Sequence, residues 1–266
     1  MKLLVGAAER LRIWCASKAL SVSLKLFSWT GERPKWLKKR PEPRGEIRVF
    51  DRWIGTSHAD MEISLRELYR ELCNTPTDIQ DFLPALSAYA QQCETIVESG
   101  MRGGTSTVAF LVGLLDNGKT IKQYIGCDLE RNKCVDALQA AAQESGIDFT
   151  FLNGSDLEQS FPPCDLLFID TWHVYGQLKR ELEMFHHLTP RIILHDTTVD
   201  ELIGETVRLK TNIIGQMRST GWQMGEIVLG LWPAVLEFLV AHPEWEIEAR
   251  YSHCNGLTIL KRRDDQ

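Results

Sequence analysis

From residue 94 onward, short apolar runs alternate with longer segments in which apolar residues recur at helical spacing. The short runs are rich in β-branched and aromatic residues, as is typical of strands buried on both faces. The predicted strands are 95–97, 121–127, 149–152, 165–169 and 191–194, and the predicted helices between them are 105–115, 131–144 and 177–187. This alternation, with short connections, predicts a parallel sheet with helices on both faces.

The last part of the chain follows a different pattern. Residues 232–241 are helical in pattern, and Pro233 lies in the first turn, where proline is tolerated. Two strand-like segments, 245–252 and 257–261, then flank His253–Gly256. Within that connection, Asn-Gly is a dipeptide that favours hairpin turns. The sequence therefore predicts an α/β fold whose mostly parallel sheet ends in an antiparallel hairpin.

The first 45 residues differ in character from the rest. Residues 1–29 have apolar positions at helical spacing, whereas residues 30–45 are rich in proline, lysine and arginine, as linkers often are. The predicted boundaries are a helical and basic extension at 1–45 and a domain at 46–266. Inside that domain, two further helices are predicted at 60–73 and 77–91, and Thr77 or Asp78 is a candidate N-terminal cap for the second.

Charge and cysteine content narrow the function classes. Residues 1–44 carry 11 basic and 3 acidic side chains, whereas the remainder carries 19 and 33. An acidic body argues against a dedicated nucleic-acid binder, because phosphate contacts need clustered cations. The seven cysteines are scattered and form no C-x-x-C pair, which favours reduced thiols in a cytoplasmic protein. No apolar run approaches the roughly 18 residues that span a bilayer.

The N-terminal segment leaves two alternatives open. Residues 1–29 are strongly apolar and are followed by Lys35, Lys38, Lys39 and Arg40. An apolar helix beside cations can lie in an anionic membrane interface, where each cation contributes about 1 kcal/mol. The apolar residues do not keep to one narrow stripe, which favours packing on the protein core or on a second copy in a homo-oligomer.

A glycine-rich turn follows the first predicted strand, between Glu98 and Ser106. Gly100 and the pair Gly103 and Gly104 permit backbone angles that other residues resist, so that a ligand can approach the main chain. The N–H groups of the following helix suit an anionic group. A tight strand–helix connection without a ligand is the alternative. The turn lacks both the Gly-Lys-Ser/Thr of a P-loop and the G-x-G-x-x-G spacing of a dinucleotide fold.

Two acidic residues follow the second and third strands. Asp128 is placed to accept hydrogen bonds from both ribose hydroxyls of an adenine nucleoside. The alternative is that it caps the next helix. Asp156 can accept a hydrogen bond from the adenine amino group, or it can cap a short helix that begins near residue 157.

A second group of polar residues follows the fourth and fifth strands. Asp170 and His173 follow the fourth strand, and His195 and Asp196 end the fifth. Because parallel strands end at the same edge of a sheet, these side chains are expected around one crevice. They can hold a divalent cation, or they can serve as a base and the group that orients it. The alternative is that the aspartates cap helices.

Together these motifs resemble class I S-adenosylmethionine-dependent methyltransferases over roughly residues 46–262. The nearest group is the sugar and small-molecule O-methyltransferases of the macrocin and cephalosporin-hydroxylase-like type. The segments that carry the resemblance are Thr95–Ser106, Asp128, Phe168–Tyr175 with Gln177–Leu182, His195-Asp196-Thr197 and Asn255–Leu260. The resemblance implies a Rossmann-like fold and S-adenosylmethionine as cofactor.

The resemblance also implies roles for single residues. Glu98 and Gly100 would border the methionine part of the cofactor, and Asp128 would bind ribose. Asp170 and Asp196 match positions that hold Mg²⁺ in metal-dependent relatives. This chain carries His195 where an acidic ligand is common, and imidazole favours a softer ion than Mg²⁺.

The sequence supports three functions. The first is O-methylation of a hydroxyl on a sugar or other small molecule. For this reaction Trp172 replaces an acidic base of some relatives, so we expect neutral His173 to remove the hydroxyl proton. The others are a nucleotide-dependent oxidoreductase and a non-catalytic cofactor-binding or scaffold domain.

Overall fold

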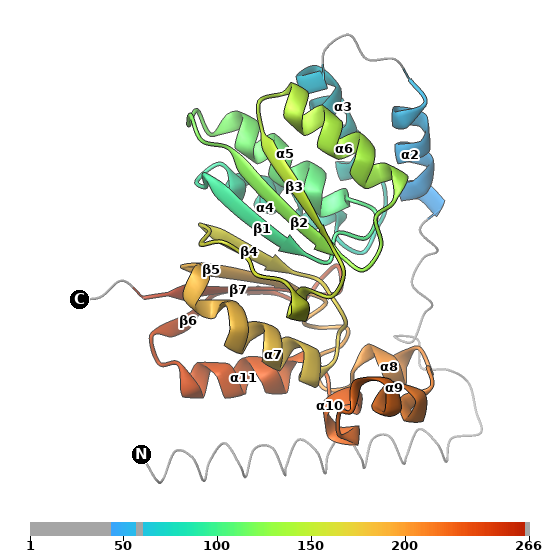
Figure 1. The fold of residues 1–266 in the computed structure, drawn as a ribbon, viewed down its shortest axis with the longest axis vertical. Coiled ribbons are helices and arrows are strands. Elements are labelled where there is room, and N and C mark those ends of the chain that lie inside the picture. Colours follow the sequence, from blue (N-terminus) through green and yellow to red (C-terminus); the bar gives the residue numbers. More distant parts are fainter. Residues whose placement is uncertain (1–43, 57–60, 264–266) are drawn as a thin grey trace.

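The protein is a seven-stranded sheet with helices on both faces (Figure 1). The computed structural model describes residues 44–56 and 61–263. The strands are β1 (Thr95–Ser99), β2 (Gln123–Asp128), β3 (Asp148–Asn153), β4 (Leu166–Ile169), β5 (Arg191–His195), β6 (Trp245–Tyr251) and β7 (Leu257–Arg262). Each of the five predicted strands before residue 200 is present.

The strands lie in the order β3-β2-β1-β4-β5-β7-β6. Strands β1 to β5 pair in parallel, and β7 pairs antiparallel with both β5 and β6. The order reverses beside β1, and such a switch point opens a ligand crevice at the carboxyl ends of the strands. This is the Rossmann-like class I methyltransferase fold, as predicted.

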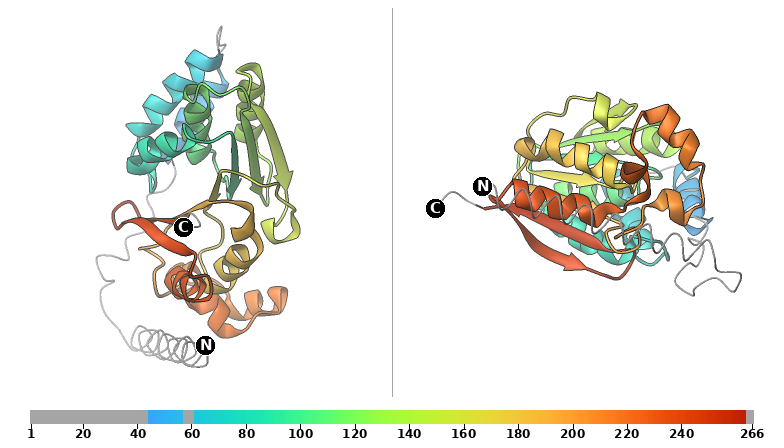
Figure 2. Two further views of the ribbon diagram at one scale, coloured as in Figure 1. Left: turned by 90° about the vertical axis from the view of Figure 1, so that its left-hand side faces the viewer. Right: turned by 90° about the horizontal axis from the view of Figure 1, so that it is seen from below.

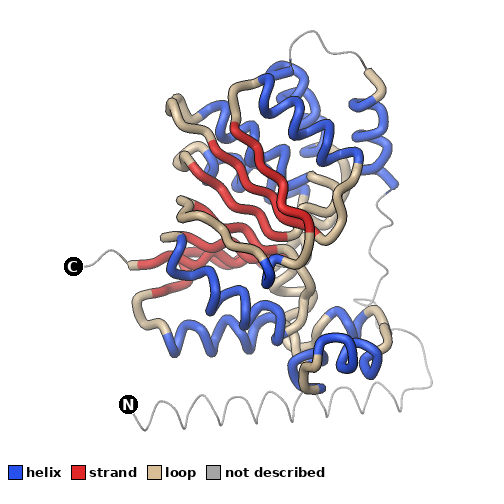
Figure 3. The backbone as a smooth tube through the Cα atoms, in the orientation of Figure 1, coloured by secondary structure: helices blue, strands red, loops and turns tan. Residues whose placement is uncertain are grey.

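Two groups of helices cover the two faces of the sheet (Figure 3). One face packs on α2 (Arg44–Ile54), α3 (Met61–Cys73), α4 (Leu83–Ala90), α5 (Thr105–Asp116) and α6 (Lys133–Glu144). The other face packs on α7 (Tyr175–Phe185) and α11 (Leu231–Ala241), which lie side by side (Figure 1). The sequence pattern had not indicated α2.

Residue alternation along the strands divides the core in two. In β4, Leu166 and Phe168 belong to the cluster under α2–α6, whereas Leu167 and Ile169 belong to the cluster under α7 and α11. Successive side chains of a strand point to opposite faces, so a run buried on both sides is apolar throughout. Burial on both faces therefore explains why the predicted strands are continuous apolar runs.

A group of short helices after β5 was not predicted. It comprises α8 (Glu205–Arg208), α9 (Ile213–Thr220) and α10 (Met224–Val228). Figures 1 and 2 place these helices together, beside the N-terminal end of α7. Helices of four to eight residues are too short for apolar periodicity to reveal.

Two elements differ in their boundaries from those predicted. The helix expected at 77–91 is a 3₁₀ turn, Gln80–Phe82, followed by α4, whose first turn holds a proline. The connection between β6 and β7 has five residues, and Cys254, Asn255 and Gly256 all have positive φ.

The predicted helix at 1–29 and nearly all of the basic linker lie outside the described residues. The expected membrane or assembly role of this segment therefore stays a prediction. Among the helices of residues 44–56 and 61–263, none has the length and apolar character needed to cross a bilayer.

Candidate active site

A cavity of about 810 Å³ opens at the carboxyl edge of the sheet. Its size lies within the range of small-molecule and cofactor sites. It extends from the ends of β1 and β2 to the end of β4, and α9 forms one wall. The residues that line it include Ser99, Gly100, Arg102, Asp128, Leu129, Ser155, Asp156, Asp170, Thr171, Trp172, Gln177, Glu205, Thr220 and Trp222.

The glycine turn forms one edge of the cavity through Gly100 and Arg102. Gly100 has a φ of +91°, and a Cβ atom there would lie 2.3 Å from the carbonyl oxygen of Asp170. Gly104 precedes α5 with a φ of +89°, and a Cβ atom there would meet Leu138. Gly100 therefore lets the turn pack against the end of β4, whereas Gly103 and Gly104 lie away from the cavity lining.

Glu98 and Ser106 do not line the cavity. The Glu98 carboxylate is fully buried and accepts hydrogen bonds from Ser106, from Tyr124 and, at 2.8 Å, from Thr107. Burial raises the pKa of Glu98 to about 7. These side chains therefore connect β1 to α5 and β2, and the structure does not bring Glu98 or Ser106 to the cavity, contrary to expectation.

Asp128 lies at the cavity, as expected from its place at the end of β2. One oxygen, Oδ2, accepts a hydrogen bond of 2.6 Å from the backbone N–H of Arg102. This contact ties the glycine turn to the end of β2. The alternative role as a helix cap is wrong, because Asn132 caps α6 through hydrogen bonds from the N–H groups of Cys134 and Val135.

Asp156 also lines the cavity, but its carboxylate is already engaged. It accepts hydrogen bonds of 3.0 Å from Ser99 Oγ and from Gln177 Nε2. The capping alternative is wrong here too, since Ser155 is the N-cap residue and makes no side-chain capping bond. Asp156 thus fixes the wall between β1 and α7 where it meets the cavity.

The four residues predicted after β4 and β5 come together in one cluster. His173 Nε2 lies 2.9 Å from Asp170 Oδ1, and its Nδ1 lies 2.8 Å from Asp196 Oδ2. His195 Nδ1 lies 3.3 Å from Asp170 Oδ1 and 3.3 Å from Asp196 Oδ1. Asp196 has a φ of +57°, a conformation that aspartate tolerates better than most residues. In this conformation the Asp196 carboxylate lies between the imidazoles of His173 and His195.

Of these four residues, Asp170 is the one that lines the cavity. Its side chain is 22% exposed and lines the cavity, whereas those of His173, His195 and Asp196 are 6% exposed or less and do not. The cluster therefore lies beneath the cavity wall and presents one carboxylate to it.

The charge state of His173 differs from the prediction of a neutral base. Burial alone would lower the pKa of His173, but Asp196 and Asp170 together raise it well above its usual value. Both ring nitrogens face carboxylates, an arrangement that favours the doubly protonated imidazole. His173 is thus suited to hold Asp170 and Asp196 in place, a role that differs from the expected neutral base.

Neighbouring opposite charges also favour the ionised forms of Asp170 and His195. Burial opposes ionisation of Asp170, but the charge of His195 and the hydrogen bond from His173 lower the pKa of Asp170 well below its usual value. Burial would lower the pKa of His195, but Asp170 and Asp196 raise it to about 9. The carboxylates and imidazoles therefore form a network of opposite charges.

The predicted metal ligands Asp170, His195 and Asp196 fit a divalent cation. Each offers one ligand atom, and the three atoms lie within 4.8 Å of one another. Two carboxylates and an imidazole suit a transition metal such as Mn²⁺, Fe²⁺ or Zn²⁺ better than Mg²⁺. Binding would require His195 to be neutral, because a metal takes the place of a proton on the ligating nitrogen.

Three charged residues of this site were missed in the sequence. Asp200 and Glu205 approach His173 Nδ1 at 3.2 and 3.4 Å, and Arg208 forms a two-pronged pair with Asp200 at 2.5 and 2.7 Å. The acidic residues that follow His195 at short intervals were the available signal.

An aromatic pair was also missed. The ring of Trp222 stacks on Trp172, with ring centres 5.5 Å apart and an angle of 18° between the planes. Arg180 covers Trp222 at 4.1 Å and pairs with Glu226 at 2.9 Å. This stack joins the loop after β4 to the segment between α9 and α10 at the cavity wall.

Comparison with protein families gives one match in the centre of the chain. Residues 97–197 match a family model described as a methyltransferase domain. The matched segment begins in β1 and ends just after Asp196, so it contains every strand-end residue discussed above. This central part of the chain is therefore similar to methyltransferase domains. A search of curated proteins finds no significant match to this chain.

Several solved structures have a similar arrangement of elements. A methyltransferase of Podospora anserina, bound to SAH, aligns over 89% of this chain and 100% of its own, with 15% identity and a TM-score of 0.48. An O-methyltransferase of Bacillus cereus in complex with SAH aligns over 91% and 97%, with 13% identity and a TM-score of 0.46. The O-methyltransferase of Streptomyces achromogenes involved in tomaymycin synthesis, in complex with SAM, aligns over 92% and 96%, with 14% identity and a TM-score of 0.44.

Proposed function

We propose that this protein is an S-adenosylmethionine-dependent O-methyltransferase that methylates a hydroxyl group of a small molecule. The observation that carries the proposal is a single cavity, lined by the glycine turn and Asp128 at one end and by Asp170 at the other. The methyltransferase-domain match over residues 97–197 supports the same function.

The residues along the cavity suit the parts of S-adenosylmethionine. Asp128, an acceptor at the end of β2, suits the ribose hydroxyls. Leu129 and Leu157 offer apolar surface for the adenine ring beside Asp156. Gly100, at the end of β1, leaves room for the methionine part close to the main chain. Glu98 acts from below this surface, by holding α5 and β2 in place.

Methyl transfer is an in-line displacement, and its main requirement is alignment. The acceptor oxygen must lie opposite the sulfonium sulfur, and its proton must leave. Asp170 lines the cavity and is placed to accept a hydrogen bond from the acceptor hydroxyl, which orients the oxygen and provides an acceptor for its proton as the methyl group is transferred. His173 and His195 hold that carboxylate from below. A bound divalent cation would supply Lewis acidity that lowers the pKa of the hydroxyl.

The acceptor end of the cavity favours a hydroxylated molecule with a flat or ring-shaped face. Trp172 and Trp222 line the cavity, and Gln216, Ser219 and Thr220 of α9 add hydrogen-bonding groups. Sugars and phenols both combine an apolar face with hydroxyl groups. We therefore propose a sugar or phenolic acceptor, in keeping with the macrocin-like group that the sequence resembles.

Replacement of Asp128 tests the cofactor end of the cavity. We expect Asp128→Ala to weaken binding of S-adenosylhomocysteine by roughly tenfold or more, because each hydrogen bond to a charged acceptor contributes about 1.5–3 kcal/mol. The measurement is calorimetric titration at constant salt.

Asp136→Ala is the matched control, since Asp136 is 62% exposed on α6 and outside the cavity lining. The control variant should bind as the wild type does. Equal affinity of the Asp128→Ala variant and the wild type would remove Asp128 from the cofactor site.

Chelation tests whether the cluster beneath Asp170 uses a cation. We expect EDTA to abolish methyl transfer and Mn²⁺ or Zn²⁺ to restore it, with Mg²⁺ less effective because His195 is a ligand of the set. Turnover is followed by release of S-adenosylhomocysteine. Full activity in chelator after dialysis would show that the charge network works without a metal.

A further inference from the structure

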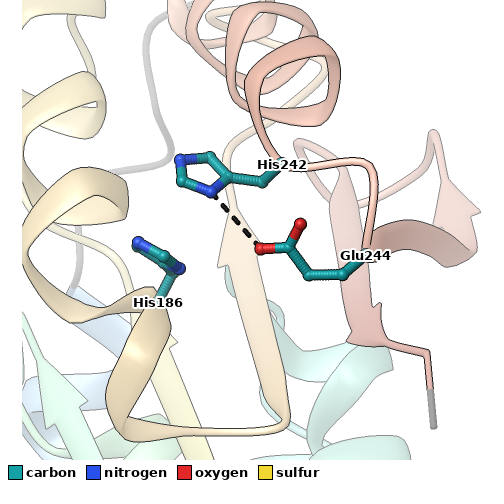
Figure 4. Close-up of side chains that lie close together, drawn as sticks. All are labelled: His186, His242 and Glu244. Carbon is teal, nitrogen blue, oxygen red and sulfur yellow. Dashed lines mark ion pairs between the residues drawn. The ribbon is translucent and has the colours of Figure 1, made fainter. Parts of the chain in front are cut away.

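A second group of side chains of metal-ligand type lies at the opposite edge of the sheet from the cavity. His186 directly follows α7, His242 directly follows α11, and Glu244 directly precedes β6. One ligand atom from each residue lies within 4.8 Å of the others. Figure 4 shows the three side chains converging between the ends of these elements.

We propose that His186, His242 and Glu244 form a binding site for Zn²⁺ or a similar transition-metal ion. Two imidazoles and one carboxylate make a ligand set that zinc uses, with a fourth position left for water. The site is separate from the Asp170 cluster, and it does not depend on the proposed methyl transfer.

The geometry is close to that of a bound site. Zinc binds imidazole nitrogen and carboxylate oxygen at about 2.0–2.2 Å, so two ligand atoms in a tetrahedral site are about 3.4 Å apart. The three ligand atoms here lie within 4.8 Å of one another, so small side-chain rotations bring them to binding distance. His242 Nδ1 already lies 3.4 Å from Glu244 Oε1, and the rings of His186 and His242 have centres 4.2 Å apart.

The main chain around the site is held in place, which lowers the entropic cost of binding. The His242 N–H donates to Phe238 O at 2.8 Å, and the Trp245 N–H donates to His242 O at 3.0 Å, closing the turn between α11 and β6. Phe238 packs against both imidazoles, with ring centres 5.6 and 4.7 Å away.

The surroundings favour a cation. Glu183, on α7, places Oε1 at 3.7 Å from His242 Nε2, so a second carboxylate lies next to the three ligands. An ion at this place would join the ends of α7 and α11, the two helices that cover one face of the sheet.

The test is titration of the full chain with ZnCl₂, followed by calorimetry and by thermal unfolding. We expect the wild type to bind one more Zn²⁺ per chain than the His242→Gln and Glu244→Gln variants. At a hundredfold excess over Kd, linkage predicts a Tm increase of roughly 5–10 °C for the wild type, and this increase should be largely absent in both variants.

His187→Gln is the matched control, because His187 is the adjacent, exposed histidine and does not belong to the three-residue set. It should bind zinc with the wild-type stoichiometry. Glu244 is half exposed, so its replacement keeps the fold even if the His242 variant is unstable. Equal stoichiometry in the wild type and in the Glu244→Gln variant, or an equal loss in His187→Gln, would overturn the proposal.

Discussion

Asp170→Asn is expected to reduce kcat by about 10²–10⁴-fold, the range typical of a group that acts on the reacting proton. Asp170 is the cavity-lining carboxylate of the strand-end cluster, and it faces both His173 and His195. An amide removes the charge that orients the acceptor hydroxyl while keeping the shape of the side chain. Affinity for S-adenosylhomocysteine should change far less, because we propose that Asp128 and the glycine turn bind that part of the cofactor.

Single-turnover kinetics and calorimetry separate these two effects. A matched control is Thr171→Ser at the next position, which keeps the hydroxyl that donates to Glu181 and should retain activity within a few fold. The Tm of each variant shows whether the buried imidazoles tolerate the loss of charge. Wild-type kcat in a folded Asp170→Asn variant would remove Asp170 from the reaction.

Gly100→Ala is expected to lower both stability and cofactor binding. The added Cβ would lie 2.3 Å from the Asp170 carbonyl oxygen, and the φ of +91° is unfavourable for any L-residue by about 1–2 kcal/mol. The backbone must move, and a total cost of about 2–4 kcal/mol is typical of overpacking combined with strain. For a domain of this size, that corresponds to a fall in Tm of roughly 5–15 °C.

Gly118→Ala is the matched control for this substitution. Gly118 also has a positive φ, +64°, but a Cβ atom there would meet nothing within 4 Å. It should therefore show the conformational cost alone, about 1–2 kcal/mol, and keep wild-type affinity for S-adenosylhomocysteine. If the two variants have the same Tm and affinity, the close approach of Gly100 to Asp170 does not matter.

The strand ends of the active site could be predicted from the sequence because parallel strands finish at one edge. Asp128 and Asp156 come to the cavity, and Asp170 and Asp196 come to one cluster, for this reason. The face of the sheet on which the Glu98 side chain lies could not be predicted. In β1 the buried run has no polar alternation to mark its two faces, and Glu98 lies on the same face as Ile96, under α5, whereas Ser99 faces the cavity.

The charge of His173 could not be predicted for a different reason. Two of the carboxylates near its Nδ1, Asp200 and Glu205, follow β5, in a segment without recognisable periodicity. A pKa depends on every charge that the fold brings within a few ångströms, and sequence distance gives no measure of that. The same segment leads to α9 and Trp222, so their side of the proposed acceptor end could not be predicted either, whereas Asp170 and Trp172 could.

The central claim is that the cavity between Asp128 and Asp170 binds S-adenosylmethionine. The most direct test is calorimetric titration of the wild-type chain with S-adenosylhomocysteine and, separately, with NAD. We predict that S-adenosylhomocysteine binds at one site per chain and competes with S-adenosylmethionine, whereas NAD gives no saturable heat. Saturable binding of NAD with no binding of S-adenosylhomocysteine would contradict this account and would favour a nucleotide-dependent oxidoreductase.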